Sequence, residues 1–159
     1  MGKDGESFWD YSLALYDRPG VEPALLALQD EAGLEVNLIL FCCYAAARGV
    51  ELGAPDIDAM RRIGTVWAEG VVRPLRDVRR ALKPLAATPE TEAARLRDEV
   101  KQAELAAEKT MQEALEALLP EHRAAGSREL AERNLAAWLG EASADPRLAI
   151  VLDRAFGRR

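Results

Sequence analysis

The sequence has 159 residues, of which 49% are apolar and 30% are charged, and its formal net charge is −6. A chain of this length fits one domain that buries roughly 70% of the surface exposed by the unfolded chain, without requiring disulfides or metals for stability. The negative charge argues against a dedicated nucleic-acid-binding protein, because such proteins normally present a cationic face to phosphate groups.

The sequence starts with a polar segment, MGKDGES, which we do not expect to be a secretory signal, because no apolar segment follows a basic start. Ser7 and Asp10 form a capping-box-like pair, which predicts a helix over residues 8–16. Four of the nine aromatic residues lie there, and at 100° per residue the apolar side chains cover an arc of about 200°. Such an arc is typical of a helix packed between two others, and it would also suit a surface that binds a ligand or a partner.

A second helix is predicted over residues 21–32, where Gly33 ends it. The next segment, EVNLILFCCYAAARG, is apolar on every side, which is typical of a central helix surrounded by others. Its apolar run, residues 38–47, is about half the length of a membrane-spanning helix. We therefore expect a soluble, cytoplasmic protein.

Polar and thiol side chains stand out in this central helix. Asn37 must find a hydrogen-bond partner if it is buried, and a backbone group, Ser12 or a tyrosine hydroxyl would serve. Cys42 and Cys43 are adjacent, so their side chains point about 100° apart and can neither pair nor chelate a metal. We expect both cysteines to be buried, reduced and inert.

An apolar stripe in steps of three and four residues predicts helix over residues 56–85. Pro74 lies inside this segment, where its ring would clash with the carbonyl group of Gly70. The stripe keeps its phase across the proline, so we predict a kink or short break between two helical halves. A side chain added at Gly70 is expected to destabilise the fold, because Pro74 already crowds the helix.

Thr88 and Pro89 look like an N-cap followed by a proline in the first turn, and they predict a long amphipathic helix to about residue 119. About 30 residues would span roughly 45 Å, which exceeds the diameter expected for a compact globule of this length. The long helix therefore either protrudes or is broken. Two shorter helices, over residues 127–139 and 146–156, end the chain.

Together these segments predict an all-α fold, a single-domain helical bundle of about six to seven helices with one long amphipathic helix. The domain is expected to cover residues 7–156. Residues 1–6 are predicted to be a flexible N-terminus, and residues 157–159 a C-terminal tail.

The sequence lacks the standard catalytic and metal-binding patterns. His122, the one histidine, lies in a turn-like segment and lacks the Glu-x-x-His pattern of a di-iron bundle. Acidic pairs on the long helix, such as Glu104 with Glu108 and Glu113 with Glu116, indicate a solvated face rather than an acid–base site. We predict no catalytic residue, no metal site and no cofactor.

Two candidate binding sites remain. A ligand pocket would be lined by Trp9, Tyr16, Asn37 and Trp67, with Arg73 at its mouth. The second candidate is a basic stripe at helical spacing, which consists of Arg73, Arg76, Arg80 and Lys83. The stripe would either face the acidic long helix of the same chain or bind an acidic protein, an anionic membrane or nucleic acid.

The run FWDYSLALYDRPGVEPALLALQDEAGLEVNLILFCCYAAARG, followed by VVRPLRDVRRALK, resembles a family of small proteobacterial proteins of unassigned function. The resemblance covers roughly residues 8–119, and it is carried by the aromatic start together with RPGV, LQD, VNLILF and the RPLRDVRRALK block. It implies a shared fold unit but no activity, cofactor or catalytic residue.

The leading hypothesis is a cytoplasmic helical interaction or adaptor protein without enzymatic chemistry, which binds an unknown protein partner or a second copy of itself. The alternative is a small-molecule or lipid-binding bundle whose pocket lies near the aromatic first helix, with enzymatic activity left open. Nucleic-acid binding through the basic stripe is the weakest hypothesis, because the rest of the chain is acidic.

Overall fold

The computed structural model describes residues 5–121 and 123–157, which form helices and connecting turns without any strand. The predicted all-α class is therefore confirmed. The chain forms two compact units: unit 1 consists of Met1–Met60 and Gln112–Arg159, and unit 2 of Arg61–Met111.

The predicted domain limits stay a prediction. Most residues of the expected flexible N-terminus, 1–6, and of the expected tail, 157–159, lie outside the described residues. The predicted turn position of His122 also lies outside them.

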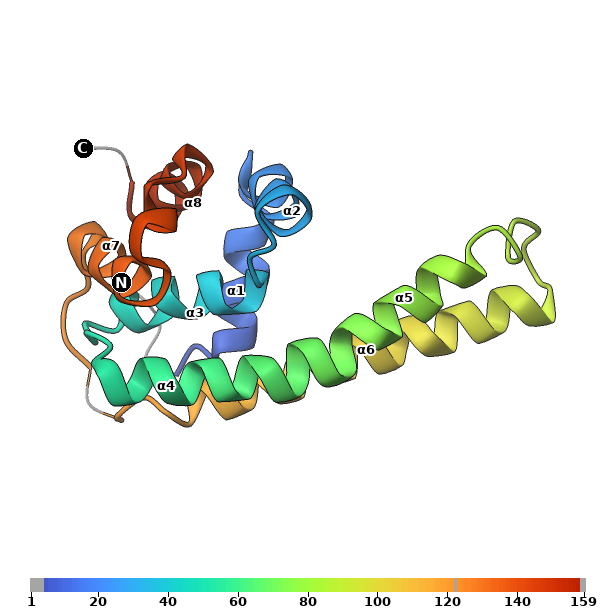
Figure 1. Cartoon of the computed structure of the whole chain (residues 1–159), viewed down its shortest axis with the longest axis horizontal. Helices are drawn as coiled ribbons and strands as arrows, with labels where there is room; N and C mark the ends of the chain where they lie inside the picture. Colours follow the sequence, from blue (N-terminus) through green and yellow to red (C-terminus); the bar gives the residue numbers. More distant parts are fainter. Residues whose placement is uncertain (1–4, 122, 158–159) are drawn as a thin grey trace. The chain divides into compact units, whose positions relative to one another are not determined.

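Unit 1 is built around α3 (Val36–Ala47), in which every residue from Asn37 to Ala46 is buried. Around this helix pack α1 (Phe8–Tyr16), α2 (Val21–Ala32), α7 (Arg128–Leu139) and α8 (Pro146–Phe156) (Figure 1). A short 3-10 segment, η2 (Gly140–Ala144), joins α7 to α8. The prediction of a central apolar helix is confirmed.

The aromatic residues of α1 are divided between the core and the surface. Phe8 is fully buried, with its ring stacked on Tyr44 at 5.1 Å and tilted against Phe41 at 5.6 Å between ring centroids. Trp9 and Tyr16 are partly exposed. Phe8 of the first helix therefore packs in the core, whereas Trp9 and Tyr16 lie partly at the surface.

The two cysteines of α3 are free and fully buried, as expected. Burial raises the pKa of Cys43 to about 12 and raises the pKa of Cys42 well above its usual value. Both side chains are therefore neutral thiols within the core.

The C-terminal end of α3 packs backbone to backbone against residues 124–126. The Ala124 N–H donates to Arg48 O at 3.0 Å. A Cβ atom at Gly49, where φ is +75°, would lie 2.7 Å from the Cβ of Ala124, and one at Gly126 would lie 2.3 Å from Ala46 O. These two glycines permit the close approach of the loop to the helix end.

In unit 2 the helical path continues from the end of α4 (Ala54–Ile63) through a π-helical segment, η1 (Gly64–Val72), into α5 (Arg73–Leu82). The Arg73 N–H donates to Ala68 O, five residues earlier, which is the π-helical pattern. Widened turns of this kind are a known cause of helix kinks, and here the segment directly precedes Pro74 in the first turn of α5. The predicted kink therefore takes the form of a π-helical segment.

Gly70 lies within η1, where a Cβ atom would meet only Thr65 O at 3.8 Å, an ordinary van der Waals distance. The expected crowding at Gly70 is therefore absent, because the wider π-helical turn separates the backbone from Pro74. The structure therefore gives no steric reason why a side chain added at Gly70 should destabilise the fold.

The predicted long helix is confirmed as α6 (Glu92–Glu116), an unbroken helix of 25 residues that spans about 37 Å. It begins later than expected because Glu90 adopts a positive φ of 67° and Thr91, not Thr88, supplies the cap. The Ala94 N–H donates to Thr91 Oγ1 at 3.2 Å. The last turn of α6, from Gln112 onward, belongs to unit 1.

Candidate ligand-binding pocket

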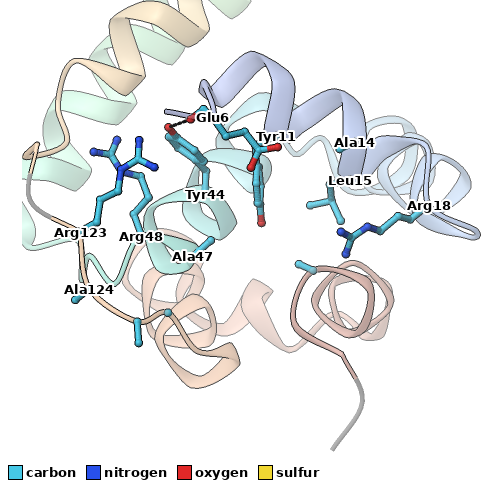
Figure 2. A pocket seen from close by; sticks show the side chains of 13 residues that line it. Glu6, Tyr11, Ala14, Leu15, Arg18, Tyr44, Ala47, Arg48, Arg123 and Ala124 are labelled. Carbon is cyan, nitrogen blue, oxygen red and sulfur yellow. Dashed lines mark hydrogen bonds between the residues drawn. The ribbon is translucent and has the colours of Figure 1, made fainter. Parts of the chain in front are cut away.

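Unit 1 contains an open pocket of about 990 Å³ (Figure 2). Its walls come from α1, from the C-terminal end of α3, from residues 123–126 and from α8. The space is open because many of the lining residues are alanine or glycine, namely Ala14, Ala47, Ala124, Ala125, Gly126 and Ala155. The volume lies at the upper end of the range of roughly 300–1,000 Å³ that is typical of small-molecule sites.

Helical spacing brings the lining residues to one side of each helix. Tyr11, Ala14, Leu15 and Arg18 follow the i, i+3, i+4, i+7 pattern along α1 and the turn after it. Tyr44, Ala47 and Arg48 repeat the i, i+3, i+4 part of this pattern at the end of α3. Two helix faces therefore meet across the pocket, and the loop held by Gly49 and Gly126 closes a third side.

Tyr44 is anchored by hydrogen bonds. Its hydroxyl lies 2.9 Å from Glu116 Oε1 and 3.0 Å from Glu6 O, and it donates to these acceptors. Glu116 Oε1 also accepts from the Phe8 N–H at 3.1 Å, so this carboxylate satisfies a free donor at the start of α1. Burial and the hydrogen bond to Glu116 raise the pKa of Tyr44 to about 12.

Tyr11 differs from Tyr44 in the hydrogen bonding of its hydroxyl, although the two rings pack with their centroids 5.3 Å apart. Figure 2 shows the Tyr11 ring projecting from α1 into the pocket region. Its hydroxyl is buried and has no hydrogen-bond partner among the described residues. Burial, assisted by the thiol of Cys43, raises the pKa of Tyr11 above its ordinary value, so the hydroxyl stays protonated at neutral pH.

Arg48 supplies a second unsatisfied polar atom. Its guanidinium lies over the Tyr44 ring, 5.5 Å from the centroid, and its Nη2 donates to Pro120 O at 2.8 Å. The Nε atom of Arg48 is buried without a hydrogen-bond partner in the described part of the chain. Arg123 is exposed and also lines the pocket (Figure 2).

The pocket is electropositive in a negatively charged chain. Among the described residues, Arg18, Arg48 and Arg123 line it together with one carboxylate, that of Glu6. One Arg18 nitrogen donates to Arg154 O, which fixes this side chain against the end of α8. Three arginines facing one glutamate give the lining a positive charge, whereas the whole chain carries −6.

The five residues predicted to line a ligand pocket are not brought together at this pocket. Trp9, Tyr16 and Asn37 belong to unit 1, whereas Trp67 and Arg73 belong to unit 2. None of the five is among the described residues that line it. Their role in binding stays a prediction.

Asn37 is engaged in a buried hydrogen-bond network. Its Oδ1 accepts from Gln112 Nε2 at 2.8 Å, and its Nδ2 donates to Glu35 Oε1 at 3.1 Å. Gln112 Nε2 also lies 3.2 Å from Ser12 Oγ. Asn37 therefore reaches Ser12 through Gln112, and the network ties α1, α3 and the last turn of α6 together.

The predicted basic stripe is divided in the structure. Arg76 pairs with Glu104 and Glu108, each at 3.2 Å, so it faces the acidic long helix within unit 2. Arg79, which the prediction did not include, also pairs with Glu104 at 2.5 Å. The other members of the stripe are exposed and have no ion pair in the described part of the chain, namely Arg73, Arg80 and Lys83.

The Glu104 carboxylate is therefore part of a partly buried ion-pair cluster and not of a solvated face. Burial alone would raise the pKa of Glu104, but hydrogen bonds from Arg79 and Arg76 outweigh this effect and hold it below its usual value. Glu116, bound to Tyr44 and to the start of α1, is likewise turned inward. The expectation of a solvated face is wrong for these two carboxylates.

Within residues 5–121 and 123–157, no group of three or more metal-binding side chains is gathered in one place. Over the same residues, no helix is both long and apolar enough to cross a membrane.

The sequence interpretation missed the lining residues Tyr11, Tyr44, Arg48 and Arg123. The i, i+3, i+4 spacing at each helix end was a usable signal for the first three. No local pattern indicated Arg123, because its position depends on a loop packing against the end of a helix more than 70 residues earlier.

A family model described as "Protein of unknown function (DUF2390)" matches residues 7–115. No curated protein and no solved structure matches the chain. The matched stretch contains the pocket walls formed by α1 and α3, and it ends before residues 123–126, which form another wall.

Proposed function

The chain belongs to the DUF2390 family, whose description assigns no activity, and from the pocket we propose that unit 1 binds a small molecule. One observation carries this proposal: the Tyr11 hydroxyl is buried at the pocket wall without a hydrogen-bond partner among the described residues. A buried polar group left unsatisfied costs about 1–3 kcal/mol. A ligand atom that accepts a hydrogen bond there would remove this cost, so the wall is suited to a bound molecule.

The raised pKa values favour binding over acid–base catalysis. Burial raises the pKa of Tyr11 and of Tyr44 further above neutral, so neither hydroxyl acts as a base at neutral pH. The Tyr11 hydroxyl, which has no partner among the described residues, remains able to donate to a ligand. The two free, buried cysteines suit a reducing compartment. We propose that the protein acts in the cytoplasm as a binding protein.

Filling the pocket tests this function. Ala14 lines the pocket from α1, whereas the neighbouring Leu13 is exposed and does not line it. Ala14→Trp should occupy the space, and Leu13→Trp is the matched control. Thermal denaturation of the full chain would be measured with a panel of small acids, phosphates, amines and neutral amides.

We expect at least one class of compound to raise the Tm of the wild type and of Leu13→Trp but not of Ala14→Trp. A ligand at 100 times its Kd stabilises the folded state by about 2.7 kcal/mol, which is readily measured. If no compound stabilises the wild type, or if Ala14→Trp responds equally, the pocket does not bind small molecules.

A second function, protein interaction, is supported by exposed apolar side chains in unit 2. Leu85 is 69% exposed and Val66 is 62% exposed, and Val78 and Leu96 are each 48% exposed. Helix α5 has no fully buried residue. The helices of unit 2 thus leave these four apolar side chains exposed, two of which, Val78 and Leu85, belong to the predicted apolar stripe, and exposed apolar side chains are what an interaction module would present.

The occupant that we propose for this surface is a second copy of the chain. Free cations on α5, such as Arg80 and Lys83, complement the excess acidic charge of α6, and each copy would offer both. Light scattering on wild type and on the double variant Leu85→Lys/Leu96→Lys tests this. A concentration-dependent dimer that the double variant abolishes is expected, and a wild-type monomer at all concentrations would exclude self-association.

A further inference from the structure

The unsatisfied atoms at the pocket wall define the chemistry of a ligand. Arg48 Nε carries a proton and can only donate. The Tyr11 hydroxyl stays protonated and is also available as a donor. Two donors without acceptors are best satisfied by a ligand that brings acceptor oxygens.

The charges of the lining narrow this class to anions. Arg48 and Arg123 both belong to the pocket lining, among whose described residues Glu6 supplies the one carboxylate. Positively charged groups at one site repel each other, and a bound anion replaces this repulsion with charge-assisted hydrogen bonds. Guanidinium groups suit carboxylate and phosphate oxygens in particular.

The remaining lining is suited to an apolar or aromatic body. The rings of Tyr11 and Tyr44 lie next to each other, and Leu15 and several alanines complete the surface. Neither the Tyr11 hydroxyl nor Arg48 Nε is open to solvent in the free protein, so a ligand reaches them only after side chains of the pocket wall change rotamer. Rotamer changes at a binding surface are common.

We propose that the pocket binds a small molecule with a carboxylate or phosphate group held by Arg48 and Arg123 and an apolar body beside Tyr11 and Tyr44. This inference rests on the proposed function and adds the charge and polarity of the ligand. The anionic group could belong to a free metabolite or to a lipid headgroup, which share the same chemistry at the arginines.

Matched probes separate the anion requirement from binding as such. Benzoate and benzamide have nearly the same shape but differ in charge, and phenyl phosphate offers the other anionic group. Calorimetric titration of the full chain should show benzoate and phenyl phosphate binding at least about tenfold more tightly than benzamide, as charge-assisted hydrogen bonds require. Both anions should bind more weakly at high salt.

Arg123 provides the variant, because it is exposed and has no ion pair in the described part of the chain. Arg123→Gln should weaken the binding of both anions by about tenfold and leave benzamide unchanged. Arg62→Gln, in α4, is the matched control, because Arg62 is exposed and is not among the residues that line the pocket, and loss of its positive charge should change affinity by less than about twofold.

Benzamide binding as tightly as benzoate, or Arg123→Gln binding benzoate as well as the wild type, would overturn the anion proposal. If all three probes bind with equal affinity and Ala14→Trp abolishes their binding, the anion proposal fails but the proposed function stands. Binding that survives Ala14→Trp would overturn both. Flotation with phosphatidic acid vesicles that is lost in Arg123→Gln would identify a headgroup as the source, and binding of phenyl phosphate without flotation would identify a free molecule.

Discussion

The rings of Tyr11 and Tyr44 pack 5.3 Å apart at one pocket wall, yet within residues 5–121 and 123–157 only the Tyr44 hydroxyl has hydrogen-bond partners. Removing each hydroxyl should therefore have different effects on stability. Tyr44→Phe leaves the Glu116 carboxylate with one fewer donor and should lower the free energy of unfolding by about 1–2 kcal/mol. Tyr11→Phe removes an unsatisfied group and should leave the free energy of unfolding unchanged or raise it. Urea denaturation measures both variants, and equal losses would mean that the Tyr11 hydroxyl is satisfied.

Tyr44 should also make stability depend on alkaline pH. Its pKa in the folded protein, about 12, exceeds the usual value of 10. As pH rises the unfolded chain loses the phenolic proton first, so stability that is present below pH 10 is lost as pH approaches 12. The stability difference between wild type and Tyr44→Phe should shrink over this interval. A difference that stays constant would show that the pKa of Tyr44 is not raised by folding.

Replacing Gly126 and Gly70 by alanine should change the stability of the fold in opposite directions. A Cβ atom at Gly126 would overlap Ala46 O, so Gly126→Ala must displace the loop and should cost about 1–3 kcal/mol or more. At Gly70 the new atom has room, and alanine should stabilise the helix by about 0.5–1 kcal/mol. Thermal denaturation of both variants checks this pair. A destabilising Gly70→Ala would restore the crowding by Pro74 that the sequence predicted.

Charge reversal should separate the two kinds of residue in the basic stripe. Arg76→Glu places a negative charge beside the partly buried Glu104 and Glu108 and should lower stability by about 3 kcal/mol. Arg80→Glu changes an exposed side chain and should alter stability by about 0.5 kcal/mol or less. Chemical denaturation of the two variants provides the comparison. Equal effects would contradict the internal pairing of Arg76.

Both cysteines should react slowly with thiol reagents in the folded protein. Cys42 and Cys43 are fully buried, and burial raises the pKa of each thiol, which lowers the fraction of reactive thiolate. Titration with a chromogenic disulfide should detect two fast thiols only after denaturation. Prompt reaction of either cysteine under native conditions would place it at an accessible site.

The helices were predictable because their signals are local. The capping pair Ser7 and Asp10, the apolar segment around Cys42 and the stripe across Pro74 each indicated a helix that the structure contains. The start of α6 was misplaced because Thr88-Pro89 and Thr91 offer competing caps, and the positive φ of Glu90 decides between them. A single sequence does not show which of two nearby caps is used.

The pocket was less predictable because it depends on contacts between distant segments. The network from Asn37 through Gln112 to Ser12 required a partner on the long helix that no spacing rule identified. Likewise, the inward position of Glu116 follows from the free N–H groups at the start of α1 and not from the alanine-rich pattern around it. Composition predicted a solvated Glu116 carboxylate, whereas one donor from α1 and one from α3, the Phe8 N–H and the Tyr44 hydroxyl, hold it in place.

Both junctions between the two units fall within helices, since Met60 and Arg61 are consecutive residues of α4, and Met111 and Gln112 of α6. Proteases require an extended backbone that fits their active-site cleft, and helical turns do not offer one. Limited digestion should therefore cut first in the connections at residues 84–90 and 117–121, and leave both junctions intact. A nick at the first of these positions would produce two fragments that each carry part of both units, so neither fragment could be purified as a separate domain.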